Sequence, residues 1–110
     1  MYNEASFRLI GRIAKIQRVG GAIKVNVANN FDVKGDDGKY EEKTTYNQVT
    51  VFGKQAEWVE NKRKVGDLVL VEGNLHDSQY QDKKGETVYT VERNANRFEL
   101  LTSAPAKNED

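Results

Sequence analysis

The chain has 110 residues, with 17 basic and 17 acidic side chains and no cysteine. This length fits one domain with its own hydrophobic core, and the lack of cysteine excludes disulfide scaffolds, thiolate zinc sites and cysteine nucleophiles. Since the formal net charge is zero, there is no overall cationic field, and a nucleic-acid partner would require cations concentrated locally.

Membrane insertion and secretion are not expected from the sequence. No apolar run approaches the length of a membrane helix. Residues Met1 to Ser6 lack the charged-then-apolar order of a signal peptide. We therefore expect an intracellular protein.

The N-terminal part predicts two paired strands. Ser6–Gln17 alternates two sets of residues, with Gly11 at a point where the strand can bend. Gly20 and Gly21 turn the chain, and Ala22–Asn29 alternates more cleanly, which predicts a hairpin. The expected inward residues are Phe7, Leu9, Gly11, Ile13, Ile23, Val25 and Val27, and the expected outward ones are Arg8, Ile10, Arg12, Ala14, Lys24 and Asn26.

The next segment predicts a loop and then a third strand. Phe31–Lys43 is charged and rich in turn residues, so we expect a long mobile loop with its tip at residues 36–39. Thr45–Phe52 alternates with a period of two, which places Val49 and Val51 in the core. The same alternation places Tyr46, Gln48, Thr50 and Phe52 together on the outer face.

A helix is predicted after the third strand. Lys54–Lys64 loses the period of two and carries Ala56, Trp58 and Val59 among polar residues, as in a short amphipathic helix. We expect Trp58 to pack over the end of the strands rather than to contact a ligand.

Two further strands complete the predicted domain. Leu68–Leu75 is short and strongly apolar, which predicts a buried strand with Gly73 at a bulge or bend. A hairpin with its tip at residues 82–85 joins Ser78–Gln81 to Thr87–Arg93, and Phe98–Leu101 closes the domain.

Three strands, one helix and two more strands, with glycines in long strands, is the element order of a small five-stranded barrel. We predict an all-β OB-fold barrel with one short helix between strands three and four, spanning residues 1–101, followed by a short polar tail at residues 102–110. The alternative at this stage is an open antiparallel sheet with the helix on one face.

The third strand carries the main indication of function. Tyr46 and Phe52 are aromatic rings on a face otherwise made of amide and hydroxyl groups. Rings in this setting are suited to stack on a flat partner, and nucleic-acid bases are the commonest one. Cross-strand packing or a subunit contact is the alternative, and the phase with Gln48 and Thr50 favours stacking.

A binder that stacks bases without reading sequence also needs cations for the phosphates. Lys54 is the first candidate because it lies beside Phe52. The others are Arg8 and Arg12, four apart on the first strand, Lys24 on the outward face of the second, and Lys83 and Lys84 at a hairpin tip.

Neither a metal site nor a cofactor is expected. His76 is the single histidine and has no cysteine to join it as a ligand. The acidic loop does not fit an EF-hand, because counting from Asp32 puts Asp37 at the glycine position and Lys43 at the glutamate position.

Three segments together resemble the bacterial single-stranded DNA-binding protein family: Asn47–Glu57, Val65–Leu75, and Tyr80–Gly85 with Tyr89 after it. The similarity runs from about Phe7 to Leu101. It implies an OB-fold homotetramer that wraps single-stranded DNA with little sequence preference during replication, recombination and repair. A cytoplasmic, nucleoid-associated location follows from that role.

The resemblance also implies which rings stack. The family's positions fall on Phe31 just past the second strand, Tyr46 at the start of the third, Phe52 in the Phe-Gly-Lys motif, and Tyr80 before the hairpin tip. The family often has Trp at three of these places. The smaller rings here imply somewhat weaker stacking.

This chain departs from the family pattern in two places. It ends at residues 107–110 without the apolar, acidic tip that recruits repair and replication enzymes, so recruitment by that route is not expected. The stretch before Tyr80 is usually basic in the family, whereas here it offers His76 and Asp77, which lowers the expected local affinity for phosphate.

Two rival functions remain open on the sequence. One is a primosomal-type OB-fold accessory subunit whose exposed rings mainly contact protein partners. The other is an OB-fold nuclease, which would need carboxylates where this sequence has Arg12, Gln48 and Thr50. We therefore expect a binding module and not an enzyme.

Overall fold

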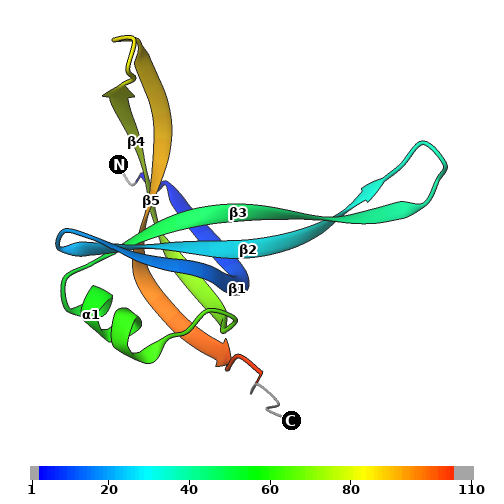
Figure 1. The fold of residues 1–110 in the computed structure, drawn as a ribbon, viewed down its shortest axis with the longest axis horizontal. Helices are drawn as coiled ribbons and strands as arrows, with labels where there is room; N and C mark the ends of the chain where they lie inside the picture. Colours follow the sequence, from blue (N-terminus) through cyan, green and yellow to red (C-terminus); the bar gives the residue numbers. More distant parts are fainter. Residues whose placement is uncertain (1–2, 106–110) are drawn as a thin grey trace.

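A computed structural model of the chain describes residues 3–105. Its elements are β1 (Ser6–Val19), β2 (Ala22–Lys34), β3 (Tyr40–Phe52), α1 (Gly53–Lys62), β4 (Leu68–Gln81) and β5 (Thr87–Thr102). The strands form one closed barrel in the order β1-β2-β3-β5-β4 (Figure 1). The predicted OB-fold barrel is confirmed, and the open sheet is wrong.

The barrel interior is filled by the inward positions of the strands. On β2 and β3 these side chains are fully buried and face each other in register, as in the pairs Ile23–Val51 and Val25–Val49. The other members of the core are Ile13, Val27, Val69, Val71, Phe98, and Ala56 and Val59 from the helix. Burial of each large apolar side chain contributes about 1.5–3 kcal/mol, so this face fixes the strand register.

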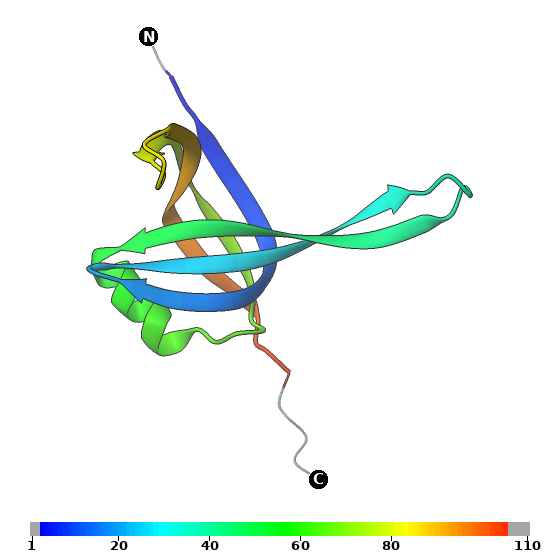
Figure 2. The same ribbon diagram turned by 45° about the horizontal axis from the view of Figure 1, so that its top comes forward.

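The β2–β3 hairpin extends far beyond the barrel as a twisted arm (Figure 2). Pairing continues to Lys34 and Tyr40, and the turn closes with a 2.8 Å hydrogen bond from the Gly35 N–H to the Lys39 carbonyl. The expectation of a loop over Phe31–Lys43 is therefore wrong except at its tip. Backbone hydrogen bonds between paired strands can extend a hairpin that has no apolar face. The charged composition of this segment therefore did not indicate its strands.

Strands β4 and β5 are continuous where the sequence predicted shorter pieces. They pair from Leu68–Thr102 to Gln81–Thr87, with a shift in register between Glu72 and Gly73. The predicted irregularity at Gly73 is confirmed. A Cβ atom at this residue would clash with the Asn94 backbone carbonyl, so the close approach of the two strands requires glycine.

Helix α1 packs against one end of β2 and β3 through Ala56 and Val59 (Figure 1). Trp58 lies off that stripe, is 45% exposed, and stacks on Arg63 with its ring centre 4.2 Å from the guanidinium carbon. The expectation that Trp58 packs over the barrel end is wrong, because a turn of 3.6 residues directs it away from the face that holds Ala56 and Val59. No helix within residues 3–105 has the length and apolarity that crossing a membrane would require.

A buried carboxylate ties the end of β5 to the loop before β4. Asp67 is only 2% exposed, and its two oxygens accept hydrogen bonds from the N–H groups of Lys64 at 2.9 Å and Ala104 at 2.7 Å. Desolvation acts to raise the pKa of Asp67, but these bonds and the charges of Arg63 and Lys64 together lower it below its usual value. Residues 106–110, most of the predicted tail, lie outside the described residues.

We expect Gly73→Ala to lower the free energy of unfolding by about 1–3 kcal/mol, the usual cost of overpacking. The matched control is Gly21→Ala, since a Cβ there meets nothing within 4 Å, and it should change stability by less than about 0.5 kcal/mol. Urea denaturation measures both. Equal losses in the two variants would contradict the close approach at Gly73.

We expect Asp67→Asn to lower the free energy of unfolding at pH 7 by about 1–3 kcal/mol, because a backbone N–H loses its acceptor. The lowered pKa of Asp67 means that its stabilisation is present above the pKa of the unfolded chain and is lost as pH falls through the folded pKa. The difference in free energy of unfolding between wild type and variant should therefore disappear below about pH 4. A difference that stays constant from pH 7 to about pH 3 would show that the charged carboxylate is not its source.

Candidate nucleic-acid interface

The outward positions of β1, β2 and β3 form one continuous surface, which we call the outer face. Antiparallel register aligns them in four rows across the three strands: Val19–Ala22–Phe52, Gln17–Lys24–Thr50, Lys15–Asn26–Gln48 and Arg12–Ala28–Tyr46. These rows contain three cations and no carboxylate. The chain as a whole is neutral, so this segregation supplies the local positive charge that the composition alone does not.

Two aromatic rings are exposed on the outer face. Tyr46 is 63% and Phe52 54% exposed, which confirms the expectation that the barrel interior does not take them up. They are six residues apart on β3, or about 20 Å along the strand. The face therefore offers two separate stacking platforms with amide and hydroxyl groups between them.

Lys15 is an outer-face cation that the sequence pattern missed. A register shift between Ile13 and Lys15 makes Ala14 an extra residue, and the bulge reverses the phase of the strand beyond it. Strict alternation had placed Ala14 outward. The one available signal was that Ile13 and Ile16 are both apolar although they are three residues apart.

Thr50 has the predicted orientation but is only 6% exposed. Strand β5 runs beside β3 at this point and pairs in parallel with it at Thr50–Asn94. Thr50 consequently lies on the floor of a groove between the outer face and β5. The amide of Gln48, the next outward residue on β3, donates a 3.1 Å hydrogen bond to the Asn26 side-chain oxygen and is held in place.

The groove between β3 and β5 has a volume of about 300 Å³. Its walls are Lys24, Tyr46, Gln48 and Thr50 on one side and Thr90, Val91, Glu92 and Arg93 on the other. Arg93 is half-buried in the β5 wall, and sequence reasoning did not select it because β5 lacks a clean alternation there. Glu92 is the carboxylate of this lining.

Arg12 and Lys24 are the predicted cations that the structure brings to the outer face. Arg12 is oriented by a 2.8 Å hydrogen bond from Nη1 to the Gly66 carbonyl. Lys24 is half-buried and lines the groove beside Tyr46.

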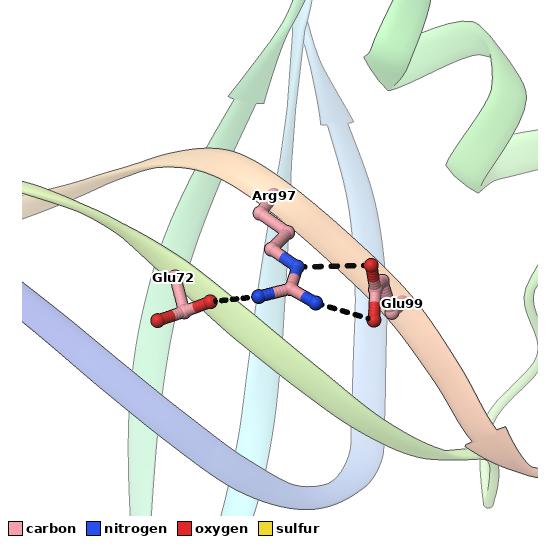
Figure 3. Close-up of polar contacts among 3 residues, drawn as sticks. All are labelled: Glu72, Arg97 and Glu99. Carbon is pink, nitrogen blue, oxygen red and sulfur yellow. Dashed lines mark hydrogen bonds and ion pairs between the residues drawn. The ribbon is translucent and has the colours of Figure 1, made fainter.

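Arg8 lies elsewhere on the barrel, although it is in phase with Arg12. It pairs in register with Glu72 of β4, which in turn pairs with Arg97 of β5. Arg97 binds Glu72 at 2.6 Å and Glu99 at 2.9 Å (Figure 3). Its hydrogen bonds to Glu99 and Glu72 raise the pKa of Arg97. The hydrogen bond from Arg97 lowers the pKa of Glu99. Charges alternate on this surface, so Arg8 stands beside a carboxylate.

The remaining predicted residues lie at the periphery. Phe31 is on the arm, where it pairs with Lys43 and has the phase opposite to Tyr46. Tyr80 is exposed on the β4–β5 hairpin, which projects from the barrel in a different direction from the arm (Figure 1). The predicted lysines outside the outer face are exposed: Lys83 and Lys84 lie at that hairpin's turn, and Lys54 lies in the first turn of α1.

Comparison with known proteins identifies related sequences. The family model described as "Single-strand binding protein family" matches residues 6–101. A single-stranded DNA-binding protein of Deinococcus radiodurans is 34% identical over 109 residues, covering 93% of this chain and 36% of the relative. One from Xylella fastidiosa is 38% identical over 80 residues, covering 72% and 59%. The chain thus spans less than two thirds of either relative.

Solved structures of similar shape support the fold. The Plasmodium falciparum SSB in complex with single-stranded DNA matches with a TM-score of 0.72 at 18% identity, covering 93% of this chain and 97% of that one. The mitochondrial single-stranded DNA-binding protein Rim1 of S. cerevisiae matches with a TM-score of 0.68 at 19% identity, covering 94% and 100%. At such identities the likeness shows the fold alone.

Proposed function

The chain belongs to the single-strand binding protein family, and from this premise we propose that it binds single-stranded DNA with little sequence preference. The observation that carries the proposal is the outer face, where two exposed rings and three cations occur together without a carboxylate. Stacking is indifferent to base identity because every base has a π-face.

The two kinds of side chain have separate roles in this mechanism. Stacking of a base on Tyr46 or Phe52 contributes roughly 1–3 kcal/mol. Arg12, Lys15 and Lys24 neutralise phosphates and release condensed counterions, so affinity falls as salt rises. The amides of Asn26 and Gln48, held by their mutual hydrogen bond, offer polar contacts between the rings.

The peripheral residues extend the contact beyond the outer face. Tyr80 with Lys83 and Lys84 supplies a ring and two cations on the β4–β5 hairpin, and Lys54 lies next to Phe52. Phe31 is the least favoured predicted ring, because the arm around it, residues 31–43, carries five acidic and three basic side chains. Arg8 makes at most a long-range contribution, since Glu72 stands beside it.

Protection of single strands during DNA replication, recombination and repair is the biological role we propose. A homotetramer and a cytoplasmic location with the nucleoid follow from the same family membership. We also propose that the chain is not an enzyme, because its family is one of DNA binding and the outer face holds amide, hydroxyl and basic groups where a metal-dependent nuclease requires gathered carboxylates.

We expect Tyr46→Ala and Phe52→Ala each to weaken binding of oligo-dT by about 1–3 kcal/mol while the melting temperature changes little, since both rings are exposed. Fluorescence anisotropy of a labelled oligonucleotide measures the binding. Trp58→Ala is the matched control, because that ring is exposed on α1 and away from the outer face.

Each alternative function has its own outcome in this experiment. Wild-type protein that leaves oligo-dT unbound would favour a primosomal-type accessory subunit whose rings contact protein. Cleavage of the oligonucleotide in the presence of magnesium would favour a nuclease. A large loss of stability with intact binding in Phe52→Ala would assign that ring to the core.

A further inference from the structure

The cations of the candidate interface come from three different strands. Arg12 and Lys15 lie on β1, Lys24 on β2, and Arg93 on β5 across the groove. Because the barrel order is β1-β2-β3-β5, these cations follow one another across the strands. Adjacent strands are about 4.8 Å apart, so this line of cations spans roughly 15 Å across the strands.

Three of these cations have no acidic partner in the structure. Within residues 3–105, the side chains of Lys15, Lys24 and Arg93 form neither an ion pair nor a hydrogen bond. Two other exposed arginines do have carboxylate partners: Arg18 binds Glu60 at 2.9 Å, and Arg97 binds Glu72 and Glu99. Neighbouring cations without acidic partners repel one another, and the phosphates of a bound strand relieve that repulsion.

The groove between β3 and β5 lies at the β5 end of this line of cations. Its volume of about 300 Å³ is at the lower limit for pockets that enclose a small molecule, which suits one nucleotide unit and not a longer segment. Tyr46 forms one wall and Arg93 the other. Lys24 and Arg93 are the cations of this lining, so the phosphate backbone of a bound nucleotide is directed toward them.

We propose, building on the function above, that a single strand crosses the barrel from β1 to β5, with Lys15 and Arg93 as phosphate contacts at the two ends of its path. The groove between β3 and β5 is then a subsite for one nucleotide. This path excludes the arm and the alternating charges around Arg97.

Charge-removing variants test the path. Binding of an oligo-dT of about eight nucleotides, within the site size of one OB-fold, is followed by anisotropy between about 0.05 and 0.3 M salt. Lys15→Gln and Arg93→Gln should each weaken binding roughly three- to tenfold and reduce the log–log salt slope by about 0.7, the value for one phosphate contact. Lys62→Gln, on the last turn of α1, is the matched control and should change neither quantity.

Two further variants separate charge from packing. Arg93→Lys keeps the charge and should keep the salt slope. Glu92→Gln removes the carboxylate next to Arg93 and should leave binding unchanged or tighter, in the opposite direction from Arg93→Gln. Thermal melting of every variant identifies any loss of folding.

Binding by the wild-type protein tests the proposed function, and the charge-removing variants test the path of the strand. Wild-type protein that fails to bind the oligonucleotide contradicts the proposed function itself. Wild-type protein that binds, with Lys15→Gln and Arg93→Gln behaving like Lys62→Gln, overturns the path and leaves the function standing. Weakening by Glu92→Gln as large as that by Arg93→Gln would also overturn the electrostatic assignment of the groove.

Discussion

Burial of the inward side chains of β2 and β3 is the constraint on which the interface depends. Val25 pairs with Val49 and Ile23 with Val51, and all four are fully buried. Because side chains alternate along a strand, a slip of one residue would expose this set and bury Lys24 and the residues in its phase. The free energy that holds the core together therefore also keeps the rings and cations of the outer face in solvent.

Closure of the barrel creates the second part of the interface. Helix α1 carries the chain from β3 past the barrel end, which leaves β3 to pair with β5 rather than β4. The two strands meet in parallel at Thr50 and Asn94, and the groove lies beside this pair, lined by residues of both strands. An open sheet with the same outer face would lack the wall that holds Arg93.

The order of the elements and the glycines in long strands predicted the barrel, and alternation within β3 predicted the orientation of Tyr46 and Phe52. Periodicity in the sequence missed Lys15, since a bulge reverses the phase of β1, and Arg93, since the groove arises only when β5 closes against β3. It also mistook the arm for a loop, because backbone pairing in register needs no apolar pattern. The prediction for Trp58 was wrong because being near Ala56 and Val59 in the sequence does not place a residue on their face of the helix.

Photocrosslinking measures directly whether bases lie on the outer face. A strand that carries 5-iodouracil forms covalent bonds with aromatic side chains in contact with the base when it is irradiated, and trypsin then separates the candidates. Residues 44–54 form one tryptic peptide with both Tyr46 and Phe52, whereas Trp58 lies in residues 55–62 and Phe31 in residues 25–34. We expect crosslinks mainly in the peptide of residues 44–54. Crosslinks confined to the peptides of Trp58 and Phe31 would show that bases bind away from the outer face.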